Sequence, residues 1–360
     1  MDLEKRIELI TRIPIEEIIT AKELRELLET NECPVAYDGF EPSGYANIAT
    51  GLMRAQKIGD LVEAGVKFKI LLADWHAWIN EKMGGDLEKI RAVGRYIIKV
   101  WESLGLDTSK IEIIWASDLV KDTEYWKKVI LVLKDTTVKR MTRCLTVMGR
   151  LNGELKSAAQ YIYPAMQVAD IFHMKIDICQ LGIDQRKANI LAREVGKKRW
   201  YKPVSLHHHL IMGLQGPTKM GGYDENNSID QQIASKMSKS IPETSIFVHD
   251  SPSSINRKMK MAFCPEKQVE DNPILEILKY VIFRGSEKEF TIRRSSKHGG
   301  DLAVWTFEEL EKLYKKGGLH PLDLKNAVGK ELTIMLEPCR KYFDKHAEYL
   351  EVFKESKVTR

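Results

Sequence analysis

The chain lacks the features that would place it in a membrane, secreted or zinc-binding class. No apolar run reaches the roughly 18 residues that a membrane helix needs, and the charged N-terminal stretch has no signal-peptide core. The five cysteines are odd in number and scattered, with no CxxC pair, which argues against a disulfide framework and a thiolate zinc site. We therefore expect a cytosolic globular protein that does not contact a membrane.

A strong excess of one charge is also missing. The formal net charge of +5 permits an acidic partner such as RNA, but it fits a mildly basic solvated surface equally well. With 43% hydrophobic and 30% charged residues, the composition is that of an ordinary globular protein of two or three domains.

The first two thirds of the chain alternates short apolar runs with helical patterns. Residues 51–64 and 86–104 have helical periodicity, and a glycine follows each of these stretches. Because short apolar runs separated by helices are typical of βαβ units, the pattern predicts an α/β fold with a parallel sheet. The expected strands lie at 35–37, 67–73, 111–116, 178–183 and 204–211.

Changes in sequence character predict the domain boundaries. A mostly helical stretch at about 119–174 is too long for a simple crossover and indicates an insertion within a first domain at 1–214. Residues 215–235 are rich in Gly, Asn, Ser and Gln and predict a flexible loop, the first part of a mobile segment at 215–252. From residue 253 onward the pattern is helical, with the last expected helix at 322–343, so we expect a separate α-helical domain at 253–360.

Polar turns follow three of the expected strands. In open parallel sheets ligands bind beyond the carboxyl ends of the strands, so these turns should converge on one pocket. Gly39 and Gly44 in the first turn allow close backbone approach, and the helix that follows offers its N-terminus to phosphate. The turn is not a Walker loop, because Tyr45 occupies the lysine position, and no GxGxxG occurs. Alone, such a turn is more often structural.

A second candidate for phosphate binding is the segment Lys236-Met237-Ser238-Lys239-Ser240. Two lysines on a mobile loop can close over a triphosphate and neutralise charge on departing pyrophosphate. Alone, a solvated basic loop explains the segment better. Taken with the glycine turn, it predicts a two-part ATP site.

Six ordered segments together resemble class I aminoacyl-tRNA synthetases and, among them, the tyrosyl-tRNA synthetases of archaeal and eukaryotic type. The resemblance covers nearly the whole chain and implies a Rossmann-like catalytic domain with a helical insertion and an α-helical anticodon-binding domain. It also implies a homodimer formed through the insertion, and ATP with Mg²⁺, L-tyrosine and tRNA(Tyr) as substrates. The segments span 37–44, 72–77, 163–170, 182–187, 236–240 and 320–325.

The resemblance implies a tyrosine pocket. Tyr37 and Asp170 match the residues that hydrogen-bond the substrate phenol, which agrees with the need of a buried hydroxyl for partners. Tyr163, Gln167 and Gln185 match residues around the α-ammonium group, and the first two share a helix face with Asp170. Without the resemblance, a polar helix face would be the safer interpretation. The full implied set is Tyr37, Gly39, Ala73, His76, Tyr163, Gln167, Asp170 and Gln185.

The family's ATP motif, His-x-Gly-His, is altered here. It reads Asn47-Ile48-Ala49-Thr50, so the leading histidine is missing, and Asn47 keeps a donor amide without a charge. We expect ATP binding to survive, although losing one such contact typically slows activation by ~10²–10³. The residues implied to act on the phosphates are Asn47, Thr50, Lys236 and Lys239. The full implied ATP set is Gly39, Glu41, Ser43, Gly44, Asn47, Thr50, Gly182, Asp184, Lys236, Met237, Ser238 and Lys239.

The resemblance also implies two contacts with tRNA. Arg186 and Lys187 match a basic pair that reads the first base pair of the acceptor stem, and Arg143 in the insertion is expected to join them. His320 and Asp323 match positions at the first anticodon base, on which Phe263 is expected to stack. Without the resemblance, a solvated basic helix start and a buried phenylalanine would explain these residues as well.

The run His207-His208-His209 resembles a metal cluster, but it is not expected to bind one. Adjacent residues on a strand alternate faces, so the three rings cannot share an ion. We predict a structural role, or at most a place beside ATP, and no metal ligands. Two other functions stay open: a non-catalytic tRNA-binding relative, motivated by Asn47, and a tryptophanyl enzyme, which the Tyr37–Asp170 pair disfavours.

Overall fold

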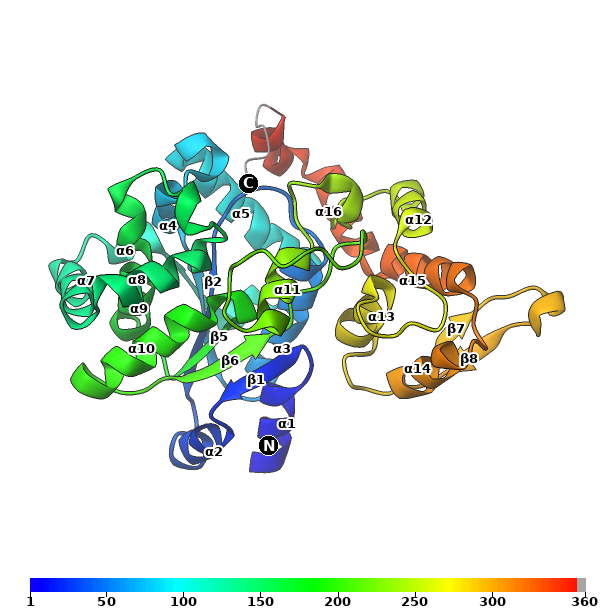
Figure 1. Ribbon diagram of the computed structural model, residues 1–360, viewed down its shortest axis with the longest axis horizontal. Helices are drawn as coiled ribbons and strands as arrows, with labels where there is room; N and C mark the ends of the chain where they lie inside the picture. The colour runs from blue at the N-terminus through cyan, green and yellow to red at the C-terminus, as the bar shows by residue number, and fades with distance from the viewer. Residues whose placement is uncertain (355–360) are drawn as a thin grey trace.

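A mostly parallel six-stranded sheet forms the centre of the larger part of the molecule in this computed structural model (Figure 1). The structure describes residues 1–354, without the side chains of Asn152 and His298. The strand order is β1-β6-β5-β2-β3-β4, in which only β1 is antiparallel to its neighbour. The strands are β1 (Ile15–Ile19), β2 (Val35–Phe40), β3 (Lys67–Leu72), β4 (Ile111–Trp115), β5 (Ile178–Gly182) and β6 (Val204–His208).

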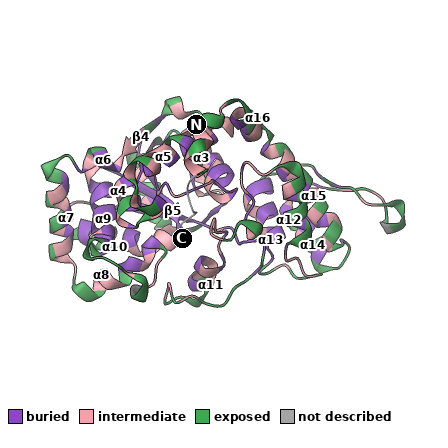
Figure 2. Ribbon diagram, turned by 90° about the horizontal axis from the view of Figure 1, so that it is seen from above, coloured by how far each residue is buried: buried purple, intermediate pink, exposed green. Residues whose placement is uncertain are grey.

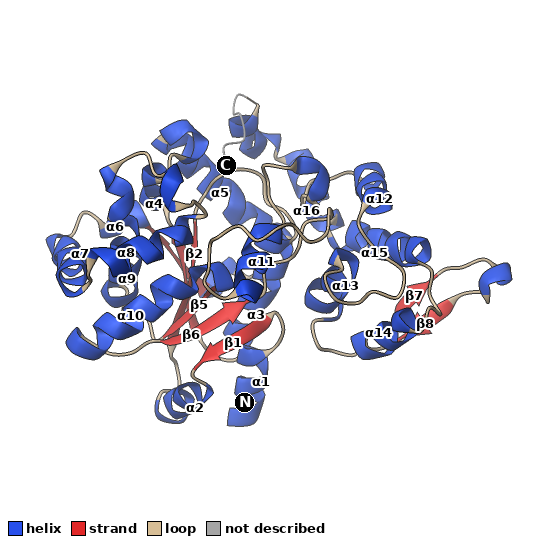
Figure 3. Cartoon of the chain, in the orientation of Figure 1, coloured by secondary structure: helices blue, strands red, loops and turns tan. Residues whose placement is uncertain are grey.

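The predicted α/β fold is confirmed, and each of its five predicted strands is present. β5 and β6 are buried along their whole length, as expected of parallel strands covered on both faces (Figure 3). The sequence analysis missed β1, because its IEEII sequence carries two glutamates and pairs only at the sheet edge. Glu17 contacts His207 of β6, and Glu16 contacts His209 just after β6, so both glutamates have partners along that edge.

The topology places a crevice between β2 and β5. From β2 the chain proceeds to β3 and β4 on one side, whereas from β5 it proceeds to β6 on the other side. Such a switch point leaves an opening at the carboxyl ends of the two strands, where ligands of doubly wound sheets bind.

The helices are α1 (Leu3–Thr11), α2 (Ala21–Thr30), α3 (Arg54–Glu63), α4 (Asp74–Ile79), α5 (Leu87–Ser103), α6 (Ala116–Leu119), α7 (Thr123–Asp135), α8 (Val138–Cys144), α9 (Tyr163–His173), α10 (Arg186–Arg199), α11 (Asn227–Ser235), α12 (Pro252–Met261), α13 (Pro273–Ile277), α14 (Phe307–Lys315), α15 (Pro321–Met335) and α16 (Glu337–Lys345).

Two expectations about the later part of the chain are wrong. The stretch 215–235 is not a loop throughout, because α11 occupies its second half. The Asp230 carboxylate of α11 accepts hydrogen bonds from the backbone N–H groups of Gly222 and Asp224, and this ties the preceding turn to the helix. The helix expected over 322–343 is broken at Leu336, since Pro338 begins a new first turn in α16.

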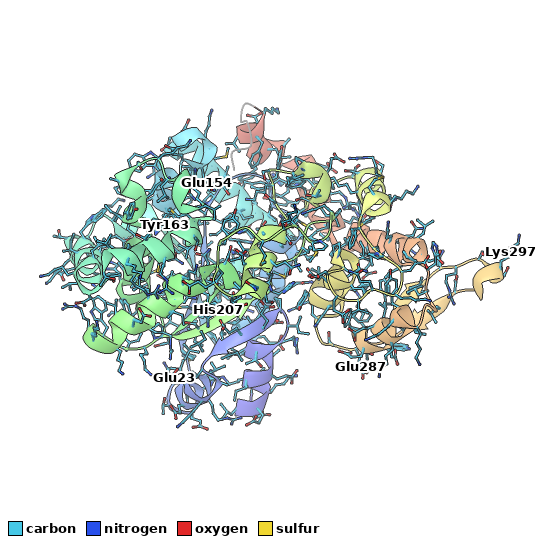
Figure 4. All side chains as sticks on the ribbon, in the orientation of Figure 1. Glu23, Glu154, Tyr163, His207, Glu287 and Lys297 are labelled. Atoms are coloured by element: carbon cyan, nitrogen blue, oxygen red, sulfur yellow. The ribbon has the colours of Figure 1, made fainter. Side chains whose placement is uncertain are left out.

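The C-terminal region is helical, as expected, but it also contains a hairpin. Strands β7 (Phe290–Ile292) and β8 (Leu302–Val304) form an arm that projects from α14 and α15 (Figure 1). Two three-residue strands are too short to leave an alternating pattern in the sequence. Figure 4 shows Lys297 at the outer end of this arm.

One apolar core connects the sheet with the C-terminal helices. Residues of β2 and β3 belong to the same buried cluster as residues of α12, α13 and α15, and Figure 2 shows buried segments in these helices as well as around the sheet. The C-terminal turn η11 (Ala347–Phe353) packs on α5. The ring centroids of Phe353 and Tyr45 also lie 4.0 Å apart. Among residues 1–354, no helix combines the length and the apolar character needed to cross a membrane.

Candidate active site

A cavity of about 840 Å³ opens at the carboxyl ends of β2, β3 and β5. Its walls come from these strand ends, from α9 and from the segment around Lys236–Ile241. The three polar turns therefore converge, as expected, and Gly44 and Gly182 are the two residues of the implied tyrosine and ATP sets that do not line the cavity. The lining members are Tyr37, Gly39, Glu41, Ser43, Asn47, Thr50, Ala73, His76, Tyr163, Gln167, Asp170, Asp184, Gln185, Lys236, Met237, Ser238 and Lys239.

One end of the cavity is closed and polar. Tyr37 is 1% exposed, and its hydroxyl has no hydrogen-bond partner within the described structure. The Asp170 carboxylate accepts a hydrogen bond from the Tyr125 hydroxyl at 2.9 Å, and its other oxygen lies 3.1 Å from Nε2 of His76. A buried phenol without a partner is costly, so Tyr37 marks a position where a ligand hydroxyl would be stabilised.

The protonation of His76 depends on Asp170. Burial alone would disfavour an imidazolium, but the adjacent Asp170 carboxylate outweighs burial and raises the pKa of His76. Sequence reasoning named His76 and Asp170 but missed Tyr125, which comes from α7 in the insertion. Its apolar helical neighbours gave no sign that its hydroxyl points to a carboxylate.

Next to this closed end, two glutamines and a tyrosine form a hydrogen-bonded rim. The Gln167 amide donates to Oε1 of Gln185 at 3.1 Å, and the Gln185 amide donates to the carbonyl of Val147 at 3.0 Å. The Tyr163 hydroxyl donates to Oε1 of Glu41 at 3.0 Å. Figure 4 places Tyr163 within the part of the molecule that contains the sheet. These groups offer oxygen acceptors that suit an ammonium ion.

The glycine turn forms the opposite end of the cavity. Gly44 has φ of 134°, a conformation that side chains rarely adopt, and a Cβ there would lie 3.6 Å from the Lys239 side chain. The turn leads into a single π-helical turn, η1 (Ala49–Met53), and then α3. π-Helical turns are frequent at functional sites.

The lysines of the Lys236–Ser240 segment reach this end of the cavity. Nζ of Lys236 lies 2.8 Å from Oδ2 of Asp184, and Nζ of Lys239 donates to the Ser43 hydroxyl at 3.3 Å. Lys236 outweighs the effect of burial and lowers the pKa of Asp184. Burial, aided by the nearby Lys82 ammonium, lowers the pKa of Lys239 to about 7. A lysine held this way is stabilised by a bound anion.

The neighbouring residues His207, His208 and His209 have separate partners. Nδ1 of His207 lies 2.6 Å from Glu17, and the ring of His208 contacts the Gln180 amide at 2.7 Å. His209 lies between Glu16 and Glu276, which outweigh burial and raise its pKa to about 9. Only His208 and His209 line the cavity. Within residues 1–354, no group of three His, Cys, Asp or Glu side chains could hold a metal ion.

The residues expected to contact tRNA lie outside this cavity. Arg143 pairs with Glu225 at 2.9 Å, Arg186 pairs with Glu17 at 2.8 Å, and the Lys187 ammonium donates to the carbonyl of Tyr223. These three residues lie close to each other in the chain's fold, on α8 and the start of α10.

The remaining three expected tRNA contacts are in the C-terminal region. His320 is exposed and caps α15, because its Nδ1 accepts from the N–H of Leu322 at 3.2 Å, and Asp323 is in the first turn. Phe263 is partly buried and packs against Gly216. The six residues therefore lie in two separate parts of the described structure, and their contacts with tRNA stay predictions.

Sequence reasoning missed four further cations of the cavity wall, Arg54, Lys82, Arg150 and Lys156. Nη1 of Arg54 lies 3.4 Å from Oδ1 of Asp38, and Nζ of Lys82 lies 3.7 Å from Oε2 of Glu41. Arg54 follows Thr50 by four residues and so shares its helix face, a spacing that could have suggested it. Lys82 left no such signal, since it lies in an irregular turn.

Comparison with known proteins agrees with this site. A family model described as "tRNA synthetases class I (W and Y)" matches residues 29–233 and 229–337. The tyrosine–tRNA ligase of Thermococcus kodakarensis is 47% identical over 378 aligned residues, with all of both chains covered.

Solved structures give the same result. The tyrosyl-tRNA synthetase of Pyrococcus horikoshii, crystallised with L-tyrosine, is 45% identical, with a TM-score of 0.92 and coverage of 98% of this chain and 100% of that one. The enzyme of Aeropyrum pernix is 40% identical, with a TM-score of 0.85 and coverage of 98% of both chains. The chain therefore belongs to the class I tRNA synthetases of the tryptophan and tyrosine family. Within that family, its similar full-length relatives are tyrosine–tRNA ligases.

Proposed function

We propose that the protein is a tyrosine–tRNA ligase, which activates L-tyrosine with ATP and transfers the tyrosyl group to the 3′ end of tRNA(Tyr). The observation that carries this proposal is the order of groups along one cavity. A phenol-binding end with Tyr37 and Asp170 is followed by the glutamine rim and then by the lysines of the Lys236–Ser240 segment. Full-length relatives named tyrosine–tRNA ligase support the same function.

In this proposal each part of tyrosine has its own set of side chains. The phenol lies between Tyr37 and Asp170, where the buried Tyr37 hydroxyl can donate a hydrogen bond and the Asp170 carboxylate can accept one. The α-ammonium group lies at Tyr163, Gln167 and Gln185, with Gly39, Ala73 and His76 forming the wall. Phenylalanine is rejected because these buried polar groups would be left without a partner.

The chemistry consists mainly of positioning and charge stabilisation. The tyrosine carboxylate attacks the α-phosphorus of ATP, and the bond to pyrophosphate breaks, which gives tyrosyl-adenylate. Lys236 and Lys239 neutralise the charge that accumulates on pyrophosphate, and Asn47 and Thr50 order the turn beneath it. In the second step the terminal ribose hydroxyl of tRNA takes the tyrosyl group and releases AMP.

ATP enters with Mg²⁺ as its counter-ion. The carboxylates nearest the phosphate end, Glu41 and Asp184, already have Tyr163 and Lys236 as partners. Phosphate oxygens, rather than a cage of protein ligands, therefore hold the cation, which is the usual mode for magnesium. The remaining ATP contacts come from Ser43, Gly44, Gly182, Met237 and Ser238.

The tRNA is held at two places. Arg143, Arg186 and Lys187 contact the acceptor stem, and Phe263, His320 and Asp323 contact the anticodon. This division corresponds to a catalytic part at 1–214, a KMSKS-bearing segment at 215–252 and an anticodon-binding part at 253–360, of which 355–360 lie outside the described residues. The protein acts in the cytoplasm as a homodimer formed through the helical insertion at about 119–174, where Ile130 and Val138 are exposed.

Tyrosine-dependent exchange of pyrophosphate into ATP tests the function. Purified protein should catalyse exchange with tyrosine and not with phenylalanine or tryptophan. Exchange with tryptophan alone would favour the tryptophanyl alternative, and no exchange at any Mg²⁺ concentration, with intact tRNA binding, would favour the non-catalytic relative that Asn47 motivates.

A further inference from the structure

The side chain at the position of the family's leading histidine does not point to a ligand. Asn47 is 1% exposed, and its Oδ1 accepts hydrogen bonds from the Thr50 N–H at 3.0 Å and from the Thr50 hydroxyl at 3.1 Å. Its amide nitrogen lies 3.5 Å from the carbonyl of Met237. Both ends of the amide are therefore engaged by the protein, and Asn47 contributes no charge to the cavity.

A cation lies close by, one helical turn further along the chain. Arg54 follows Thr50 by four residues, so these two share a helix face, whereas Asn47 precedes the first helical turn. The Arg54 side chain is 16% exposed and lines the cavity. Its guanidinium lies 5.4 Å from the centre of the Phe40 ring, and Nζ of Lys239 lies 5.5 Å from the same centre. Arg54 and Lys239 thus flank one aromatic ring at the phosphate end.

A buried carboxylate holds Arg54 there. Asp38 is 2% exposed, neither of its oxygens has a hydrogen bond, and Arg54 at 3.4 Å is its ion-pair partner among the described residues. Burial raises the pKa of Asp38 to about 6, and Arg54 opposes that effect. The other contact of Arg54 is weak: Nη1 lies 3.4 Å from the carbonyl of Gly39. In the described structure both contacts use Nη1, so the other guanidinium donors have no assigned partner.

The charges around this point are unbalanced. Arg54, Lys82, Lys236 and Lys239 line the cavity, and the carboxylates beside these four cations are three: Asp38, Glu41 and Asp184. The positive charge of Arg54 lowers the pKa of Lys239 further, after burial and Lys82. Like charges placed together in a partly dry cavity are costly unless an anion joins them, and a planar guanidinium matches phosphate oxygens with two parallel hydrogen bonds.

We propose that Arg54 is the phosphate-binding cation that takes over the role of the histidine absent at position 47. In this proposal, which rests on the proposed function, the free donors of Arg54 bind the triphosphate of ATP beside Lys239. Asp38 is the positioning residue that fixes the guanidinium. The reaction itself is unchanged, because Arg54 transfers no proton and only stabilises the charge that moves to pyrophosphate.

The first test is the Arg54→Gln variant in tyrosine-dependent pyrophosphate exchange. We expect kcat to fall by about 10²-fold, the usual effect of losing one charge-stabilising donor, while the KM for tyrosine stays within twofold of the wild type. Arg54→Lys should recover part of the rate. Arg95→Gln, an exposed arginine on α5, is the matched control and should behave as the wild type. A kcat for Arg54→Gln within threefold of the wild type would overturn the proposal.

The second test asks whether histidine at position 47 and arginine at position 54 replace each other. Asn47→His in the Arg54→Gln background should raise kcat at least tenfold, whereas Asn47→His in the wild type should change it less than threefold. Equal effects in both backgrounds would show that the two positions act independently. Such an outcome would contradict the proposal that Arg54 replaces the missing histidine.

The third test covers the case in which Arg54→Gln folds poorly, because the variant leaves Asp38 buried without a partner. Asp38→Asn and Asp38→Asn/Arg54→Gln remove that problem, and inorganic tripolyphosphate serves as the probe in calorimetry. The double variant should bind tripolyphosphate at least tenfold more weakly than Asp38→Asn, and equal affinity would overturn the proposal. This binding measurement does not depend on pyrophosphate exchange. If the wild-type protein showed no exchange, the proposed function would be refuted, and the calorimetry would still decide whether Arg54 binds phosphate.

Discussion

The two ends of the cavity are built in different ways. At the tyrosine end, Asp170 already contacts Tyr125 and His76, and the glutamines already contact each other and Val147. At the phosphate end, four cations (Arg54, Lys82, Lys236 and Lys239) lie beside three carboxylates (Asp38, Glu41 and Asp184), and burial lowers the pKa of Lys239. At the first end most polar groups pair within the protein, although the Tyr37 hydroxyl, Nδ1 of His76 and Oε1 of Gln167 have no hydrogen bond in the described structure, whereas the excess of cations at the second end favours a bound anion.

This difference explains how one cavity can combine selectivity with turnover. Buried polar groups discriminate between amino acids, because a wrong side chain leaves one of them unpaired. Crowded cations stabilise charge most when that charge is greatest, at the transition state, and so they favour the reaction over tight binding of ATP. Variants at the two ends should therefore have separable kinetic effects.

The largest effect is expected at the tyrosine end, for Asp170→Asn. The kcat/KM for tyrosine should fall roughly 10²–10³-fold, since a hydrogen bond to a charged group contributes roughly 1.5–3 kcal/mol and Asp170 has more than one. The KM for ATP should stay unchanged in pyrophosphate exchange. Asp118→Asn, at an exposed carboxylate of α6, is the control. A parallel loss of ATP affinity would show that the ends are not separable.

An intermediate effect is expected at the phosphate end, as a dependence on pH. Lys239 has a pKa near 7 before an anion binds, so it is an ammonium ion below that pH and loses its charge as the pH rises through it. Affinity for a non-hydrolysable ATP analogue, measured by calorimetry, should weaken roughly tenfold from pH 6.5 to 8.5. Lys239→Arg should remove this dependence, because arginine stays charged. A wild-type profile as flat as that of the variant would contradict the prediction.

The smallest effect is expected for Tyr125→Phe. The change removes one hydrogen bond to Asp170 and leaves the carboxylate in contact with His76. Although the lost hydrogen bond is to a charged group, the carboxylate keeps its contact with His76, so we expect a net loss of about 1 kcal/mol and a fall of about fivefold in the kcat/KM for tyrosine, without an effect on the KM for ATP. If Tyr125→Phe lowered it as much as Asp170→Asn does, the hydroxyl would have to bind the substrate itself.

The sequence predicted the sheet because its strands are short apolar runs, and their periodicity does not depend on distant contacts. It did not predict β1, whose glutamates contact His207 of β6 and His209 just after it, partners that are distant in the sequence. The convergence of three strand ends on one cavity followed from topology alone. Arg54 and Tyr125 were missed because each depends on a buried carboxylate brought to it by the fold, Asp38 and Asp170. The roles of the individual site residues stay predictions.

The shared core between the sheet and the C-terminal helices fixes the distance between the cavity and the part of the chain that carries His320. Because β2, α13 and α15 contribute to one buried cluster, the part that carries His320 cannot swing freely relative to the cavity. The distance between the cavity and α15 is then fixed. An RNA that contacts both must bend or bulge to fit this distance, because the protein does not change it. Selection among RNAs of equal sequence at the contacted bases would in that case follow their overall dimensions.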